Sequence, residues 1–227
     1  MKPGAKKALV FAAHPDDETI GIGGTIRKMA DAGCEVTVAF FTNGDEGFAD
    51  PELKKKIVEI RKAEVEKVQK ILGFKNFEFL GYPDMALPND KQALKRTTAL
   101  IRKYKPDIIF THSEVDKHRD HRALNAIAKE AYWQAGENVS ADLGKPWRAH
   151  SIYFFEVLDL VEPTHICDVS ATYESVEKAI KVYVSQLDVL PGLMQKICAI
   201  KSFRGSQIGK KYGEALCRYG KFPEEFM

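Results

Sequence analysis

Residues 9–18 read Leu-Val-Phe-Ala-Ala-His-Pro-Asp-Asp-Glu, a short apolar run that leads directly into a polar cluster. The run Leu9–Ala12 is typical of a buried β-strand, and the segment after it predicts a helix from about residue 19 to residue 33. The polar cluster thus stands at the carboxyl end of a first strand, where open α/β sheets bind ligands. His14 and Asp17 are three residues apart, so both side chains can converge on one metal ion, and zinc suits this ligand pair.

A simpler interpretation of the same residues is helix capping. Acidic side chains gather at helix N-termini because they accept free backbone N–H groups and favour the positive end of the helix dipole. Asp16, Asp17 and Glu18 would then only start a helix, and His14 would be a loop residue.

A second polar cluster, far along the chain, favours the metal site. The apolar strand expected at Asp107–Thr111 is followed by His112, His118 and His121. In a doubly wound sheet the first strand is central and the fourth strand pairs beside it, so the two clusters should meet at the topological switch point. Capping does not explain the histidines, and three protein ligands plus a water is the pattern of catalytic zinc. Spacing alone leaves open which of these histidines completes the ligand set.

The remaining pattern alternates strands with helices, which predicts an α/β fold: a Rossmann-like, doubly wound, mostly parallel sheet with helices on both faces. We expect one domain over residues 1–227, with a core of about 1–136 and a small C-terminal addition of about 137–227. The other expected strands are Glu35–Thr42, Phe77–Leu80, Ser151–Val157 and about 165–169, and the other expected helices are about 51–72, 91–104, 122–135, 173–187 and 193–202.

Composition excludes several classes of protein. Hydrophobic residues make up 44% and charged residues 29% of the 227 residues, and the net charge is +2, which is ordinary for a soluble globular protein and gives no nucleic-acid footprint. No stretch approaches the length of a membrane span. The four cysteines show no paired spacing, so free thiols in a reducing compartment are expected. These features predict a cytoplasmic protein.

Gly21, Gly23 and Gly24 raise an alternative, a non-catalytic nucleotide-binding α/β module whose glycines hold phosphate. A dinucleotide fingerprint needs its glycines in the turn after the strand, and here that turn is His-Pro-Asp-Asp. Close packing of the helix against the sheet is the favoured role of these glycines. A site that binds metal only structurally is another alternative, and it would use all four ligand positions.

The chain resembles the LmbE-like or PIG-L deacetylases, zinc hydrolases that remove the acetyl group from N-acetylglucosamine-type sugars. The resemblance rests on Ala-His-Pro-Asp-Asp-Glu at 13–18 and on Asp-Lys-His-Arg-Asp-His at 116–121. It extends to Thr-Asn-Gly at 42–44, to Arg61 and Glu64, and more loosely to the segments 204–207 and 212–215, which together span nearly the whole chain.

The resemblance implies a role for each motif residue. His14, Asp17 and His121 would bind one zinc ion per chain. Asp16 would be the general base that accepts a proton from zinc-activated water, and His118 the electrophilic group and acid that stabilises the oxyanion. Asp120 would be the partner that raises the pKa of His118 and keeps it charged.

The same resemblance implies a substrate site. Arg61 corresponds to an arginine that contacts sugar hydroxyls. Asn43, on the loop after the strand Glu35–Thr42, and Asp116, which would line the pocket, are the other expected substrate-binding residues. Some family members carry a tyrosine where this chain has Asp116, so another donor, such as Tyr82, would fill that role or the substrate would be handled differently. The expected substrate is an acetylated amino sugar, with a non-sugar amide as the alternative. Assembly as a homo-oligomer, a trimer or hexamer, is expected by family analogy.

Overall fold

The structure, a computed structural model, describes residues 5–220. The ends of the expected domain, residues 1–4 and 221–227, lie outside the described residues. In chain order the elements are β1 (Lys7–Ala12), α1 (Asp17–Asp31), β2 (Glu35–Thr42), the 3-10 helix η1 (Pro51–Lys55), α2 (Ile57–Leu72), β3 (Asn76–Tyr82), α3 (Lys91–Tyr104), β4 (Ile108–His112), α4 (Arg119–Gly136), the 3-10 helix η2 (Ala141–Leu143), β5 (Ser151–Phe155), β6 (His165–Asp168), α5 (Tyr173–Ile180), α6 (Val184–Leu187), α7 (Leu193–Ser206) and β7 (Gly213–Arg218).

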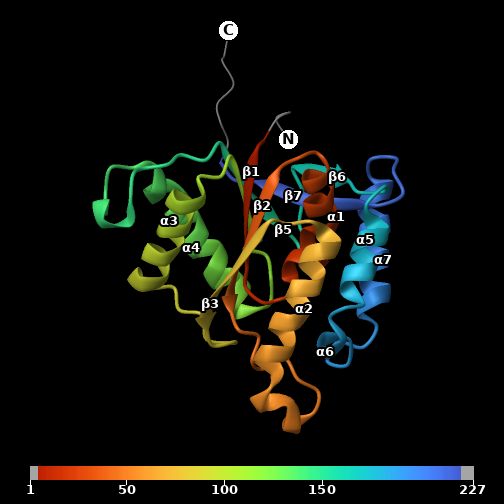
Figure 1. Cartoon of the computed structure of the whole chain (residues 1–227). Helices are drawn as coiled ribbons and strands as arrows, with labels where there is room; N and C mark the ends of the chain where they lie inside the picture. The colour runs from red at the N-terminus through yellow and green to blue at the C-terminus, as the bar shows by residue number, and fades with distance from the viewer. Residues whose placement is uncertain (1–4, 221–227) are drawn as a thin grey trace.

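The strands form one seven-stranded sheet in the order β3-β2-β1-β4-β5-β7-β6 (Figure 1). The strands from β3 to β5 are parallel, and β7 runs antiparallel to both β5 and β6. In β1, Val10 lies in register with Val38 of β2 on one side and with Phe110 of β4 on the other. The predicted doubly wound α/β fold is confirmed, and the adjacent carboxyl ends of β1 and β4 bring the two polar clusters together.

Side chains of β1 alternate between two hydrophobic cores. Ala8, Val10 and Ala12 pack into the core that α1, α2, α5 and α7 cover, whereas Leu9 and Phe11 pack into the core under α3 and α4 (Figure 1). A strand buried on both faces has no polar side to mark it, which is why β1 reads as a continuous apolar run. The two layers of helices therefore cover both faces of β1, and the carboxyl end of this central strand carries the first polar cluster.

The glycines of α1 serve close packing. A Cβ on Gly21 would lie 2.4 Å from the Phe155 ring, and one on Gly24 would lie 2.7 Å from Cβ of Val169. Both glycines lie inside a helix that rests against the sheet and α5, away from the turn after β1. The structure therefore favours the packing interpretation over a phosphate-binding glycine loop.

Three elements differ from the sequence-based expectation. The helix expected over 51–72 is split into η1 and α2 at Lys56, and the one expected over 173–187 ends at Ile180 and resumes as the short α6.

Strand β7 was not predicted at all. Glu214 in β7 is fully buried and lies 3.4 Å from Lys201 Nζ, and it accepts the N–H groups of Gly24 and Thr25. A buried, paired carboxylate breaks the apolar pattern by which a buried strand is recognised.

Residues after Gly136 continue the same sheet. β5 pairs with β4, and β7 and β6 extend the sheet beyond it. The segments after β5 and around α6 return to the carboxyl edge of the sheet, where they line a cavity with the two polar clusters. Across residues 5–220, none of the helices combines the length and apolar character needed to cross a membrane.

Candidate metal centre and active site

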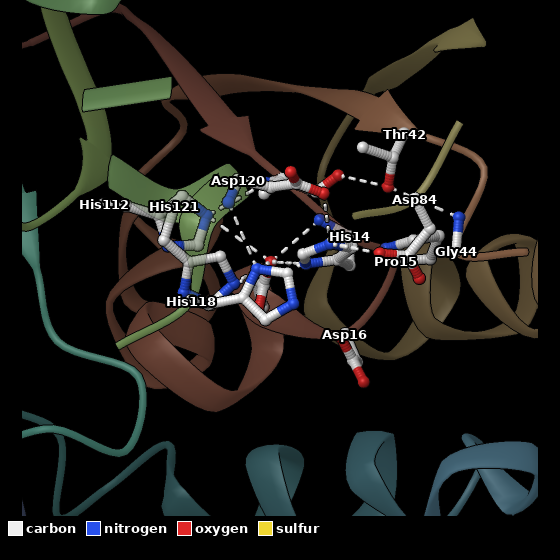
Figure 2. A network of polar contacts seen from close by, with 12 residues as sticks. His14, Pro15, Asp16, Thr42, Gly44, Asp84, His112, His118, Asp120 and His121 are labelled. Carbon is white, nitrogen blue, oxygen red and sulfur yellow. Dashed lines mark hydrogen bonds and ion pairs between the residues drawn. The ribbon is translucent and has the colours of Figure 1, made fainter. Parts of the chain in front are cut away.

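A cavity of about 440 Å³ opens at the carboxyl edge of β1 and β4. Both sequence clusters line it, and the C-terminal segments close its far side. Its polar lining includes His14, Asp16, Asp17, Asp84, His118 and His121. In Figure 2 the imidazoles of His14, His118 and His121 gather around a common centre, and Asp16 lies to one side of them.

Three side-chain atoms approach one another as the ligands of a single metal ion would. His14 Nδ1 lies 3.1 Å from Asp17 Oδ2 and 3.2 Å from His121 Nε2, and the last two atoms are 3.3 Å apart. Donors at about 2.0–2.2 Å from a tetrahedral zinc lie about 3.3–3.6 Å from one another. The donor set and its spacing therefore fit one first-row metal ion, and all three residues line the cavity.

Carboxylates orient both imidazoles from behind. The other nitrogen of His14, Nε2, lies 3.0 Å from Asp84 Oδ1 and 3.3 Å from Asp120 Oδ2. The other nitrogen of His121, Nδ1, lies 2.8 Å from Asp116 Oδ2. Metal-binding histidines commonly donate their second ring N–H to a carboxylate, which fixes the tautomer and the ring orientation. Each imidazole is therefore held with the inward nitrogen free to bind a metal.

His112 borders this centre, with its Nε2 3.4 Å from Asp17 Oδ2. Its Nε2 accepts the backbone N–H of Ala13 at 2.9 Å, and its ring stacks on His121 with centroids 4.0 Å apart. The side chain is fully buried, and its Nδ1 has no hydrogen-bond partner among the described residues. His112 thus supports the ring of His121 and the end of β1.

Charges in the centre are strongly coupled. Burial disfavours the charged imidazole of His14, but Asp120 and Asp17 beside it raise its pKa well above the usual value. Burial likewise opposes charge on His121, whereas Asp17 and Asp116 raise its pKa to about 9. Burial alone would raise the pKa of Asp17, but the imidazoles of His121 and His112 hold it well below its usual range. In the metal-free protein, protons on the imidazoles thus balance the buried carboxylates.

Asp16 has an unusual backbone and a buried carboxylate. Its φ of 135° lies in a region that non-glycine residues rarely adopt. Its Oδ2 lies 3.2 Å from Arg61 Nη2, and Arg61 also donates to the carbonyl oxygens of Pro15 and Gly44. Burial raises the pKa of Asp16 to about 7, although Arg61 favours the ionised form. Asp16 is thus a carboxylate of raised basicity at the cavity, held in a strained position.

The expected partnership between Asp120 and His118 has a different geometry. The Asp120 carboxylate lies against His14 and accepts the backbone N–H groups of Met85 and Leu87 at 2.8 and 3.1 Å. The backbone N–H of Asp120 donates to His118 Nδ1 at 3.3 Å. Burial lowers the pKa of His118, and the positive charges of His14 and His121 act in the same direction, against the weaker influence of Asp17 and Asp120. The Asp120 carboxylate therefore contacts His14 directly and acts on His118 only from a distance.

The residues predicted to bind substrate are placed differently from one another. Arg61 lines the cavity, but the residue is only 2% exposed and its guanidinium already contacts Asp16 and two backbone carbonyls. Asp116 also lines the cavity. One of its carboxylate oxygens contacts the ring of His121, and the other accepts the backbone N–H of His118 at 2.7 Å. Asn43 does not line it, and its amide points to the carbonyl of Gly81.

Tyr82 does not supply the missing tyrosine. Its ring packs under Arg96, with the guanidinium carbon 4.8 Å from the ring centroid, and it lies outside the cavity lining.

Sequence reasoning missed several lining residues. Asp84 follows β3 in a Gly-Tyr-Pro-Asp turn, and its position after a third parallel strand was the available signal. Glu46, Asp159 and Gln186 also belong to the polar lining. Glu46 lies in the loop after β2, at the same edge of the sheet, whereas nothing in the local sequence marks Asp159 or Gln186. The apolar lining consists of Ile20, Met85, Val157, Leu158, Val189 and Leu190.

Comparison with known proteins agrees with this geometry. The family described as PIG-L, GlcNAc-PI de-N-acetylase, matches residues 9–132, which carry both polar clusters. Diacetylchitobiose deacetylase from Thermococcus kodakarensis is 31% identical over 219 residues, which cover 93% of this chain and 82% of that protein.

Solved structures give the same picture of the fold. N,N'-diacetylchitobiose deacetylase from Pyrococcus horikoshii, complexed with its inhibitor MPG, matches with a TM-score of 0.88 at 32% identity, over 94% of this chain and 84% of that one. The 4-carboxy-2-hydroxymuconate hydratase from Pseudomonas putida matches with a TM-score of 0.87 at 24% identity, over 98% of this chain and 99% of that one. The hydratase shows that the fold is shared by another chemistry, so the reaction has to be argued from the site.

Proposed function

Because the chain belongs to the PIG-L (LmbE-like) family, we propose that it is a metal-dependent hydrolase that removes the N-acetyl group from an N-acetylglucosamine-type sugar. The observation that carries the proposal is the triangle of donor atoms on His14, Asp17 and His121, with sides of 3.1, 3.2 and 3.3 Å. The triangle lies in a cavity large enough for a sugar and beside an acid-base residue.

Zinc is the proposed metal, one ion per chain. Two imidazole nitrogens and one carboxylate oxygen form a catalytic zinc ligand set, which leaves one position open. When bound, zinc lowers the pKa of water to about 7 and polarises a carbonyl group.

Asp16 is the proposed general base. Its carboxylate lines the cavity next to the ligand Asp17, and burial keeps its basicity high. It accepts the proton of the attacking water and later returns a proton to the leaving amine. Arg61 holds this carboxylate and the neighbouring carbonyl of Pro15, so we assign Arg61 to the support of Asp16 and retain sugar contact only as a secondary role.

His118 is the proposed donor to the oxyanion. Because its Nδ1 accepts the Asp120 N–H, the neutral ring carries its proton on Nε2. A neutral imidazole in this tautomer donates a hydrogen bond to the developing oxyanion without a net charge. Asp120 then acts by holding His14 and by fixing the His118 tautomer through its backbone N–H.

The test is the release of free amine and acetate from N-acetylglucosamine and diacetylchitobiose by protein of known metal content. We expect activity that disappears on chelation and returns with zinc, and an Asp16→Asn variant that binds zinc but turns over poorly. Metal binding with no release from any N-acetyl sugar, but with release from simple acetanilides, would identify the substrate as a non-sugar amide. Activity that survives complete metal removal would contradict the proposal.

Two further expectations accompany the proposal. A cytoplasmic location is expected from the composition, and assembly as a homo-oligomer, a trimer or hexamer, is expected by analogy with the family. Cell fractionation tests the first, and sedimentation equilibrium of the zinc-loaded protein tests the second.

A further inference from the structure

The strained backbone of Asp16 needs an explanation from its surroundings. A non-glycine residue at φ 135° is unfavourable and persists only when neighbouring groups fix it. The carbonyl oxygen of Asp16 accepts the N–H groups of Thr19 and Ile20, both at 2.9 Å, as expected at the start of a helix. Its own N–H donates to Glu18 Oε2 at 3.1 Å. Glu18 is thus the side chain that holds Asp16 from the N–H side.

Glu18 is itself held by a residue from the far end of the chain. Its carboxylate is fully buried, and it accepts the hydroxyl of Thr19 and, at 2.8 Å, the hydroxyl of Tyr183. A buried carboxylate is costly unless donors surround it, and among the described residues these hydroxyls and the Asp16 N–H are its hydrogen-bond donors. The position of Glu18 therefore depends on Tyr183.

Tyr183 belongs to a segment that is fastened beside the cavity. Its ring is fully buried in the hydrophobic core that α1, α2, α5 and α7 cover. In the next residues, Ser185 donates to Glu64 through both its N–H and its hydroxyl, and Gln186 Nε2 donates to the carbonyl of Gly47 at 2.9 Å. Gln186 and Gly47 line the cavity. The same segment therefore contacts both the cavity wall and the support of Asp16.

We propose that Tyr183 is a positioning residue for the general base: its hydroxyl orients Glu18, and Glu18 holds the strained backbone that aims the Asp16 carboxylate. This inference rests on the proposed function for the role of Asp16. It gives the segment 183–186 a part in the reaction, although these four residues contribute none of the proposed metal ligands or acid-base groups.

The first test is the Tyr183→Phe variant, which removes one oxygen atom and keeps the ring. We expect kcat to fall about tenfold, KM to stay within about twofold, and one zinc per chain to remain, because the substrate and metal contacts are unchanged. Tyr173→Phe is the matched control, since Tyr173 is also buried in this core and its ring stacks on Tyr212 away from the cavity. Equal effects of the two variants on kcat would overturn the proposal.

A double-mutant cycle tests the route through Asp16. In an Asp16→Asn background, Tyr183→Phe should cause no further loss, because the base that it positions is already absent. An undiminished tenfold loss in that background would show that Tyr183 acts by another route. Glu18→Gln, which keeps the size of the side chain, should lower kcat at least as much as Tyr183→Phe and should make the effect of Tyr183→Phe smaller.

A measurement without substrate separates this inference from the proposed function. In the metal-free protein, hydrogen exchange of the Asp16 backbone amide should be about tenfold faster in Tyr183→Phe than in the wild type, and unchanged in Tyr173→Phe. A wild-type protein that deacetylates nothing would contradict the proposed function while this exchange result stood. Unchanged exchange in Tyr183→Phe would overturn the positioning of Asp16 even in an active enzyme.

Discussion

The two sides of the cavity are built in opposite ways. The polar floor, which we define as His14, Asp16, Asp17, His118 and His121, comes from the ends of β1 and β4. The donor atoms of His14, Asp17 and His121 in it lie 3.1–3.3 Å apart. The C-terminal wall, which we define as the cavity-lining residues between 157 and 190, is mostly aliphatic and only partly buried. Metal ligation and proton transfer tolerate little displacement, whereas an apolar wall tolerates change at modest cost. The polar floor should therefore determine the reaction, and the C-terminal wall should determine which substrates bind.

The largest effect should come from removing a ligand in the floor. His121→Ala should abolish zinc binding and lower turnover at least about a thousandfold, because a metal site with one ligand missing loses its ion and its chemistry together. Metal analysis and amine release measure both losses on one sample. The matched control is His150→Ala, since His150 is exposed and lies outside the cavity lining, and this variant should behave as the wild type. Retention of zinc by His121→Ala would remove it from the ligand set.

A large effect of another kind should follow from Asp16→Asn. The amide keeps the size of the carboxylate but cannot accept a proton, so we expect kcat to fall about 10²–10⁴-fold with zinc still bound. The measurement is steady-state kinetics together with zinc content. Full activity in Asp16→Asn would rule Asp16 out as the general base and leave the metal site intact.

The floor should also make the metal-free protein sensitive to pH. His121 is held protonated in the folded state, with a pKa of about 9 against about 6.5 when unfolded, so the folded state binds the extra proton between these values. The stabilisation is complete below pH 6.5 and is lost as pH rises through 9, and it amounts to at most about 3 kcal/mol. Urea unfolding of the metal-free protein at several pH values checks this, and His121→Asn should flatten the dependence. Stability that rises over this interval would contradict the sign.

The smallest effect should come from the C-terminal wall. Leu190→Ala removes apolar surface from the cavity but touches no ligand or base, so we expect KM to rise about three- to tenfold with kcat nearly unchanged. Leu160→Ala is the control, because Leu160 is 51% exposed and lies outside the lining. If kcat of Leu190→Ala fell as much as kcat of Asp16→Asn, the wall would take part in the reaction itself, which would contradict the division into floor and wall.

The same contrast explains what the sequence could predict. Strand β2 was predicted with the bounds observed, Glu35–Thr42, because a run of β-branched and aromatic residues marks a buried strand. The meeting of His14 and Asp17 with the second histidine cluster followed from short spacing and the topology of a parallel sheet, whereas the choice of His121 came from the family resemblance. Local sequence patterns and the rules of sheet topology therefore predict the two clusters that form the polar floor.

Other contacts lie beyond such reasoning. Tyr183 reaches Glu18 across 165 residues of sequence, and neither residue shows this partnership in its neighbours. The choice of Asp120 between His118 and His14 is a matter of side-chain direction, which sequence order does not encode. Buried polar partners of this kind depend on how whole elements pack, so they appear only with the three-dimensional structure.

The most direct test of the central claim is the zinc content of two variants, because the structure also offers His118 as a third ligand beside His14 and His121. We assign the ligand role to Asp17 and the oxyanion contact to His118. We therefore expect one tightly bound zinc per chain in His118→Ala, with activity strongly reduced, and none in Asp17→Ala at the same zinc concentration. Zinc retained in Asp17→Ala and lost in His118→Ala would contradict the assignment on which the proposed mechanism depends.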